Sequence, residues 1–170
     1  MKIHRYIHLL LVILFIAGCS SPAKITDPSP TLNPKVVMSP ASKSLTAGET
    51  YEVILSVEDV SNVFGYNIYL SFDPTLVEMV SSSAGSFLGS STTGLLANYK
   101  DSNKSSGILI IGDSRNDGKT SSGAGELCRI TFRALTSGTS SLKFYDVNST
   151  TVLEDLSGNK INVNVWVDAS

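Results

Sequence analysis

The sequence predicts an all-β sandwich, and three observations lead to that prediction. Strict alternation of apolar and polar side chains runs over residues 64–72, as in a strand with one buried face. Other short alternating or apolar segments follow at intervals, separated by turns rich in Gly, Ser and Asn. No window beyond the N-terminal apolar run has helical periodicity of useful length. The apolar faces of such strands need a second sheet to cover them, which is the arrangement of a sandwich.

The N-terminus predicts export of the chain. A basic start with Lys2 and Arg5 precedes an unbroken apolar run over residues 9–16, which is too short to span a bilayer as a stable helix. The small residues that lead into Cys19 resemble the lipobox of bacterial lipoproteins. That resemblance implies cleavage of a signal peptide at residues 1–18 and a lipid on Cys19, which would anchor the protein at the outer membrane or cell surface. A plain signal peptide with an incidental cysteine is the alternative.

Residues 19–34 are predicted to form a tether between this anchor and the folded domain. They have few apolar side chains, and prolines stand among Ser, Thr and Asp, so a semi-extended chain is expected. The folded domain is expected to cover residues 35–170.

Composition excludes several classes of function. Removal of the signal peptide would remove both histidines, and Cys128 would then be the only cysteine in the domain, so no disulfide is expected within it. Acidic residues outnumber basic ones, at 15 against 13 in the whole chain, and no basic patch is visible, which argues against nucleic acid as a partner. Without histidine, the common catalytic triads and zinc sites are unavailable, and we predict neither enzymatic activity nor a bound metal.

The first half of the domain contains four predicted strands. Residues 36–38 form a short apolar strand, and residues 51–57 alternate with valine and leucine pointing inward. The strand at residues 64–72 ends at Asp73-Pro74, because proline cannot continue a ladder of hydrogen bonds. Residues 76–80 form the fourth strand, followed by a serine- and glycine-rich loop up to residue 94.

The second half of the domain contains four more predicted strands. Residues 107–113 include four consecutive apolar residues, which indicates a central strand buried on both faces. Residues 126–135 place Cys128 in the core with Ile130, and Leu127 on the other face. Residues 140–147 and 161–167 complete the set, and in the last strand the inward residues are expected to be Ile161, Val163, Val165 and Val167.

In their order and spacing, these segments resemble the cohesin family, the receptor modules of cellulosomes and related assemblies. The resemblance covers about residues 36–167, and the matching segments are Gly48 with residues 51–57, residues 64–80, 85–88, 107–114, 125–132 and 155–161. It implies a nine-stranded jelly-roll sandwich that binds dockerins, which are small calcium-loaded helical modules, through one flat sheet face. Calcium is therefore expected on the partner, and the usual biological setting is polysaccharide breakdown.

The resemblance also implies which residues contact the partner. The recognition face of the family includes the strand that matches residues 64–72, and the positions of Gly65 and Asn67 are often Asn and Asp there. The outward residues of this strand, together with an acidic residue of the strand over residues 107–113, form the predicted partner-binding set: Gly65, Asn67, Tyr69, Ser71 and Asp113.

The sequence allows two other interpretations of the domain. A carbohydrate-binding module would stack sugars on a coplanar strip formed by some or all of four surface aromatic residues, namely Tyr69, Tyr99, Tyr145 and Trp166. Trp166 could instead pack beneath a neighbouring loop. A purely structural envelope lipoprotein would bind neither proteins nor sugars. Residues 113–118 superficially resemble a calcium loop, but Arg115 stands where a ligand is needed, so a turn is predicted.

Overall fold

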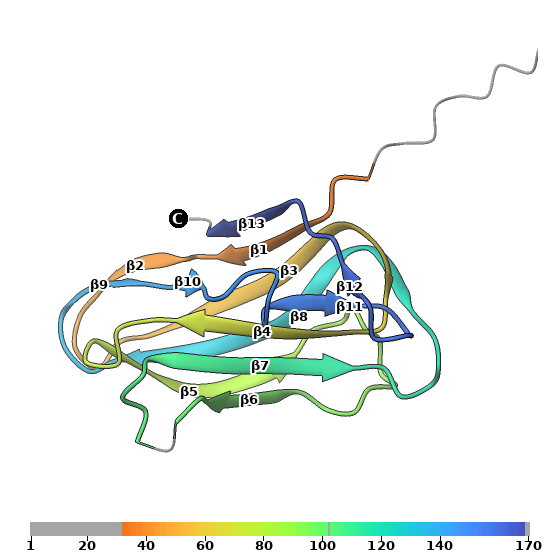
Figure 1. The fold of residues 1–170 in the computed structure, drawn as a ribbon. Helices are drawn as coiled ribbons and strands as arrows, with labels where there is room; N and C mark the ends of the chain where they lie inside the picture. Colours follow the sequence, from red (N-terminus) through yellow and green to blue (C-terminus); the bar gives the residue numbers. More distant parts are fainter. Residues whose placement is uncertain (1–31, 102, 169–170) are drawn as a thin grey trace, which may run out of the picture. The chain divides into compact units, whose positions relative to one another are not determined.

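All regular structure in the described part of the chain is β structure. The computed structural model describes residues 32–101 and 103–168, which contain thirteen strands and no helix (Figure 1). The predicted all-β class is confirmed, while the nine-strand count is not, because several strands are short or interrupted. None of the described segments is a helix long and apolar enough to cross a membrane. The predicted signal peptide and Cys19 lie outside the described residues.

The first sheet has five strands and is built around two long ones. Its order is β13 (Val165–Asp168), β1 (Lys35–Ser39), β3 (Thr50–Val63), β8 (Ser121–Ala134) and β5 (Val77–Ala84). The β1–β13 pair is parallel, and the other pairs are antiparallel. This sheet therefore joins the beginning and the end of the domain.

The second sheet has β4 at its centre. Its order is β12 (Lys160–Ile161), β11 (Val152–Glu154), β4 (Gly65–Ser71), β7 (Ile108–Ser114) and β6 (Leu96–Tyr99). One side of β4 pairs with β7 over its whole length, and the other side is shared by β11 and the short β10 (Lys143–Phe144). A separate small sheet joins β2 (Ser42–Leu45) to β9 (Gly138–Ser141).

The core lies between the two main sheets. Tyr66, Ile68 and Leu70 of β4 point into it, as the alternation predicted, and Phe132 of β8 is fully buried. The Phe132 ring stacks on Tyr51 at 5.6 Å between centroids and meets Phe72 edge-on at 5.5 Å. These aromatic contacts tie together both sheets, because Phe72 follows β4 directly.

A β-bulge corrects the predicted placement of Leu127. Leu55 pairs with Cys128 but the next residue, Ser56, pairs with Glu126, so Leu127 is an extra residue in β8. Leu127 is consequently buried instead of lying on the opposite face, and its carbonyl accepts a hydrogen bond from the Tyr66 hydroxyl at 3.1 Å. Cys128 is fully buried as predicted, and burial raises the pKa of its thiol to about 12.

The last predicted strand is wrong in its register. Residues 161–167 do not form one strand, because the chain leaves the second sheet after β12 and enters the first sheet as β13. This crossing resets the alternation: Val165 is 38% exposed, whereas Trp166 is half-buried and packs edge-on against Phe144 with their ring centroids 5.1 Å apart. The prediction that Val165 points inward is therefore overturned, and of the two interpretations of Trp166 the structure favours packing beneath a neighbouring segment.

Several strand boundaries also differ from the predictions. β3, β5 and β8 are longer than expected, and β5 continues through residues 81–84, which were predicted to be a loop. The single strand predicted for residues 140–147 is divided between β9 and β10. Strands β2, β6 and β11 were not predicted, since they have three or four residues each and little periodicity to reveal them.

We predict that Phe132→Ala lowers the free energy of unfolding by about 3–5 kcal/mol, because it removes a buried ring and leaves a cavity between Tyr51 and Phe72. Denaturant unfolding followed by circular dichroism measures the change. The neighbouring Thr131→Ala, on the solvent side of β8, is the control and should cost less than about 1 kcal/mol. Equal losses in the two variants would contradict this description of the core.

Candidate functional site

The outward side chains of the second sheet form a flat surface that we call the outer face. Strand pairing arranges them in four successive rows across the sheet. The rows are Lys160, Glu154, Gly65 and Ser114; Val152, Asn67, Gly112 and Leu96; Tyr145, Tyr69, Ile110 and Asn98; and Lys143, Ser71, Ile108 and Lys100. Four of the predicted residues, Gly65, Asn67, Tyr69 and Ser71, therefore lie together on this face.

The outer face has an apolar centre and a polar margin. Tyr69 and Ile110 are half-buried neighbours in the third row, and Leu96 and Tyr145 flank them with 52% and 40% of their surfaces exposed. Amides, hydroxyls and lysines surround this centre. An apolar centre with a polar rim is the usual anatomy of a protein-binding surface.

The opposite surface of the sandwich has a different chemistry. Arg129 forms ion pairs with Glu52 at 2.7 Å and Glu126 at 2.6 Å, and Arg133 pairs with Glu78. Among the described residues, no ion pair joins two side chains of the outer face. Covering the outer face with a partner would therefore desolvate fewer charges than covering the opposite surface.

Thr151 fixes the backbone at the centre of the outer face. The neighbour of β4 changes there from β10 to β11, which leaves the Tyr69 amide without a strand partner. The Thr151 hydroxyl accepts a hydrogen bond from this amide at 2.9 Å and donates one to the Tyr145 carbonyl at 2.5 Å. Thr151 is fully buried, and nothing in the local sequence pattern identified its role.

Asn67 and Ser71 also contact the chain beside β4. The Asn67 side-chain amide donates to the Thr150 carbonyl at 3.2 Å, and the Ser71 hydroxyl donates to the Lys143 carbonyl at 3.4 Å. These bonds orient both side chains before any partner is present. They also tie the segment around β10 to the face.

Asp113 does not lie on the outer face. It pairs with the inward-pointing Tyr66 across the strands and is 7% exposed. Its carboxylate accepts hydrogen bonds from the amides of Ser114 at 2.8 Å and Gly94 at 3.1 Å, and from the Thr93 hydroxyl at 3.2 Å. The prediction that Asp113 lies on the outer face is therefore wrong. A shift of one residue along a strand reverses the face of a side chain, so Asp113 points inward. There it holds the loop that leads into β6.

The four aromatic residues considered for sugar binding do not form one strip. Tyr99 points inward, and its hydroxyl accepts the Met79 amide at 2.7 Å. Trp166 belongs to the other sheet and packs against Phe144. Only Tyr69 and Tyr145 share the outer face, and the Lys100 ammonium lies 5.7 Å from the centroid of the Tyr145 ring. The structure thus excludes Tyr99 and Trp166 from a common strip and leaves Tyr69 and Tyr145 as the two rings that share a face.

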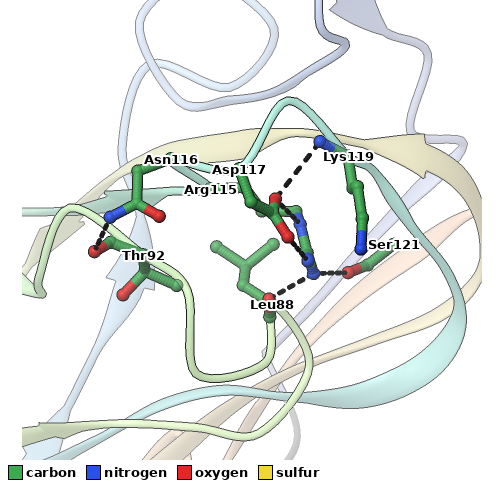
Figure 2. A network of polar contacts seen from close by, with 7 residues as sticks. All are labelled: Leu88, Thr92, Arg115, Asn116, Asp117, Lys119 and Ser121. Carbon is green, nitrogen blue, oxygen red and sulfur yellow. Dashed lines mark hydrogen bonds and ion pairs between the residues drawn. The ribbon is translucent and has the colours of Figure 1, made fainter.

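A network around Arg115 holds one end of the outer face (Figure 2). The Arg115 guanidinium donates to the Leu88 carbonyl at 2.5 Å and the Ser121 hydroxyl at 3.1 Å, and it pairs with Asp117 at 2.6 Å. Asn116 donates to the Thr92 carbonyl at 2.8 Å. The network joins the loop before β6 to the turn after β7, and so it positions the edge that carries Leu96.

The turn at residues 113–118 therefore uses its acidic groups for internal bonds. Asp117 pairs with Arg115, and Asp113 binds backbone amides. Within residues 32–101 and 103–168, no group of three or more His, Cys, Asp or Glu side chains is placed to hold a metal ion. What the site offers chemically is a preformed surface for noncovalent contact.

Comparison with known proteins identifies the family. Residues 36–170 match the family model described as the cohesin domain. The chain belongs to the cohesin family. No curated protein matches it.

Solved cohesin structures share the fold at low sequence identity. The second type II cohesin module of the ScaA scaffoldin from Acetivibrio cellulolyticus is 18% identical with a TM-score of 0.66, and the match covers 83% of this chain and 95% of that one. A type II cohesin–X-dockerin complex from the same organism gives 17% identity and a TM-score of 0.64. This match covers 79% of this chain and 93% of that one. A non-cellulosomal cohesin from Archaeoglobus fulgidus is 19% identical with a TM-score of 0.52, and the match covers 79% of this chain and 86% of that one.

We predict that Thr151→Val destabilises the domain by about 1–3 kcal/mol, because valine keeps the shape but leaves the Tyr69 amide and the Tyr145 carbonyl without their partner. Denaturant unfolding measures the loss. Thr131→Val, a threonine with the same change of shape on the opposite surface, is the control and should be nearly neutral. A neutral Thr151→Val would show that the hydroxyl does not bridge the two backbones.

We also predict that the Arg115–Asp117 contact persists to low pH. Its hydrogen bond lowers the pKa of Asp117 to about 2 from the ordinary value of 3.8. Because the folded pKa is the lower one, the stabilisation is complete above about pH 4 and is lost as pH falls toward 2. The carboxyl carbon-13 shift of Asp117 should therefore titrate near pH 2. In Arg115→Gln the midpoint should return toward the ordinary value, and an unchanged midpoint would contradict the pairing.

Proposed function

We propose that this chain is a non-catalytic cohesin module of an exported, lipid-anchored protein and that its outer face docks a dockerin-type module of another secreted protein. The observation that carries the proposal is the contrast between the two surfaces of the sandwich. The outer face has an apolar centre without ion pairs among the described residues, whereas the opposite surface is covered by ion pairs. Membership of the cohesin family supports the same conclusion.

The solved relatives support a dockerin as the partner. They include a cohesin–X-dockerin complex from Acetivibrio cellulolyticus. The outer face also suits a preorganised contact, because β4 and β7 pair without interruption and Thr151 fixes the edge of β4. A typical interface of about 800 Å² per partner would cover its four rows.

The proposed cellular setting rests on the first part of the sequence. A signal peptide at residues 1–18, a lipid on Cys19 and a tether over residues 19–34 would hold the module at the cell surface. Calcium would belong to the partner's loops, and we infer polysaccharide breakdown as the biological context. The module would supply attachment, while the docked protein would supply any catalysis.

The test uses dockerin-type modules, recognised by paired calcium loops, that are encoded in the genome of the same organism. Isothermal titration with calcium should find one or more that bind the wild-type protein. Tyr69→Ala combined with Ile110→Ala should weaken binding by about 30-fold or more, because both side chains lie at the centre of the face.

Ile54→Ala provides the matched control, since Ile54 is a half-buried isoleucine on the opposite surface. It should leave the dissociation constant unchanged. Binding that is lost in Ile54→Ala but retained in the double variant would place the docking surface on the other sheet. Binding of soluble polysaccharides and of no protein would favour a carbohydrate-binding module instead.

A further inference from the structure

Two glycines open a hollow in the outer face. Gly65 and Gly112 stand in its first and second rows, where side chains would otherwise rise from β4 and β7. A pocket lies at this end of the face, and its lining includes Gly65, Gly112, Thr93, Leu96, Ser114 and Glu154. Because neither glycine has a Cβ atom, the floor of the hollow is backbone.

Close strand packing keeps this floor bare. A Cβ atom on Gly65 would lie 2.9 Å from the Ser114 Cβ, which is too short for a real contact. A Cβ atom on Gly112 would lie 3.0 Å from the Tyr66 carbonyl oxygen. The hollow is thus a consequence of how tightly β4 and β7 approach each other, and it persists in the absence of a partner.

The two sides of the hollow differ in chemistry. Leu96 forms an apolar side and is 52% exposed. Glu154 contributes a carboxylate from β11, on the same face as Gly65. The hydroxyls of Thr93 and Ser114, 3.2 Å apart, hydrogen-bond each other at the margin. A ligand group in this hollow therefore meets the backbone floor, the Leu96 side chain along one side and the Glu154 carboxylate on the other. The Asp113 carboxylate also lines the hollow, but it is already hydrogen-bonded to the amides of Gly94 and Ser114.

The Glu154 carboxylate forms no ion pair among the described residues. Lys160 is its cross-strand neighbour, but the Lys160 ammonium donates instead to the carbonyls of Ser149 at 2.7 Å and Asn148 at 3.3 Å. Covering Glu154 with a partner that offers no cation would leave a desolvated, unpaired charge, which is strongly unfavourable. The hollow therefore requires a positive group from whatever covers it.

We propose that the hollow receives one long basic side chain, a lysine or an arginine, that projects from the docking partner. Its aliphatic stem lies over the glycine floor and against Leu96, and its cation pairs with Glu154. Lysine and arginine suit this shape, because each carries a charge at the end of an apolar stem. The inference rests on the proposed function, since it names the group that the docked module inserts.

Charge at the other end of the face makes this contact directional. The fourth row has Lys100 and Lys143 at its two sides, whereas the first row has Glu154 beside a single lysine, Lys160. The carboxylates of Asp73 and Asp101, in the turns near the lysine end, each accept hydrogen bonds within their own turn. A partner whose basic residue faced the lysines would be repelled, so the hollow selects one orientation of docking.

The experiment measures affinity for the dockerin-type module that binds the wild-type protein, by isothermal titration with calcium. Glu154→Gln keeps the size of the side chain and removes its charge, and it should weaken binding about tenfold or more. Glu154→Lys should weaken it further, and exchange of the inserted basic residue of the partner for glutamate should restore binding to Glu154→Lys. Glu58→Gln, on the opposite surface, is the matched control and should bind as the wild type does.

The outcomes distinguish this inference from the proposed function. If Glu154→Gln binds within about twofold of the wild type while Tyr69→Ala with Ile110→Ala loses affinity, the hollow takes no cation and docking at the outer face stands. If an acidic exchange in the partner does not rescue Glu154→Lys at any basic position, the pairing is overturned. If no dockerin-type module binds the wild-type protein, the proposed function and this inference fail together.

Discussion

The unbroken pairing of β4 with β7 is the constraint on which the rest of the molecule depends. Seven consecutive residue pairs join the two strands without a bulge. Since side chains alternate between the faces of a strand, one register decides both surfaces at once. It sends Tyr66, Ile68 and Leu70 into the core and leaves Asn67 and Tyr69 on the outer face. A slip by one residue would expose the core set and bury the proposed recognition set.

The same pairing explains why the two outer surfaces of the sandwich differ. On the first sheet, long strands carry arginines and glutamates that neutralise one another, as Arg129 does with Glu52 and Glu126. On the second sheet, Gly65 and Gly112 stand where a Cβ atom would crowd the neighbouring strand, and the charged groups stand only at the margins. The surface of the first sheet is thus suited to contact with water, and the outer face is suited to a partner that covers its apolar centre. The difference follows from side chains at particular registers and does not require any rearrangement on binding.

The sequence predicted the features that depend on alternation within one strand. The strand at residues 64–72, its end at Asp73-Pro74 and the burial of Cys128 all follow from local pattern, and the structure confirms them. The family resemblance supplied the layout of the sandwich and the choice of β4 as a recognition strand. The structure places Gly65 and Asn67 on the outward side of β4, as expected from that resemblance.

Features that depend on contacts between distant segments could not be predicted in this way. The bulge at Leu127 is visible only when β8 is paired with β3, and Trp166 changes face because the chain crosses between sheets just before it. Asp113 was placed one position out of register, since its neighbour Gly112 is the outward residue. Thr151 was missed altogether, because its role arises where β10 gives way to β11 along β4.

The most direct measurement of the central claim is a methyl NMR titration of the folded module with a dockerin-type module that carries calcium. Both surfaces of the sandwich present isoleucine methyl groups, Ile110 on the outer face and Ile54 on the opposite one. We predict that the signals of Ile110 and Leu96 shift or broaden on binding, while the signal of Ile54 stays in place. A shift of Ile54 with an unperturbed Ile110 would contradict the assignment of the outer face as the docking surface.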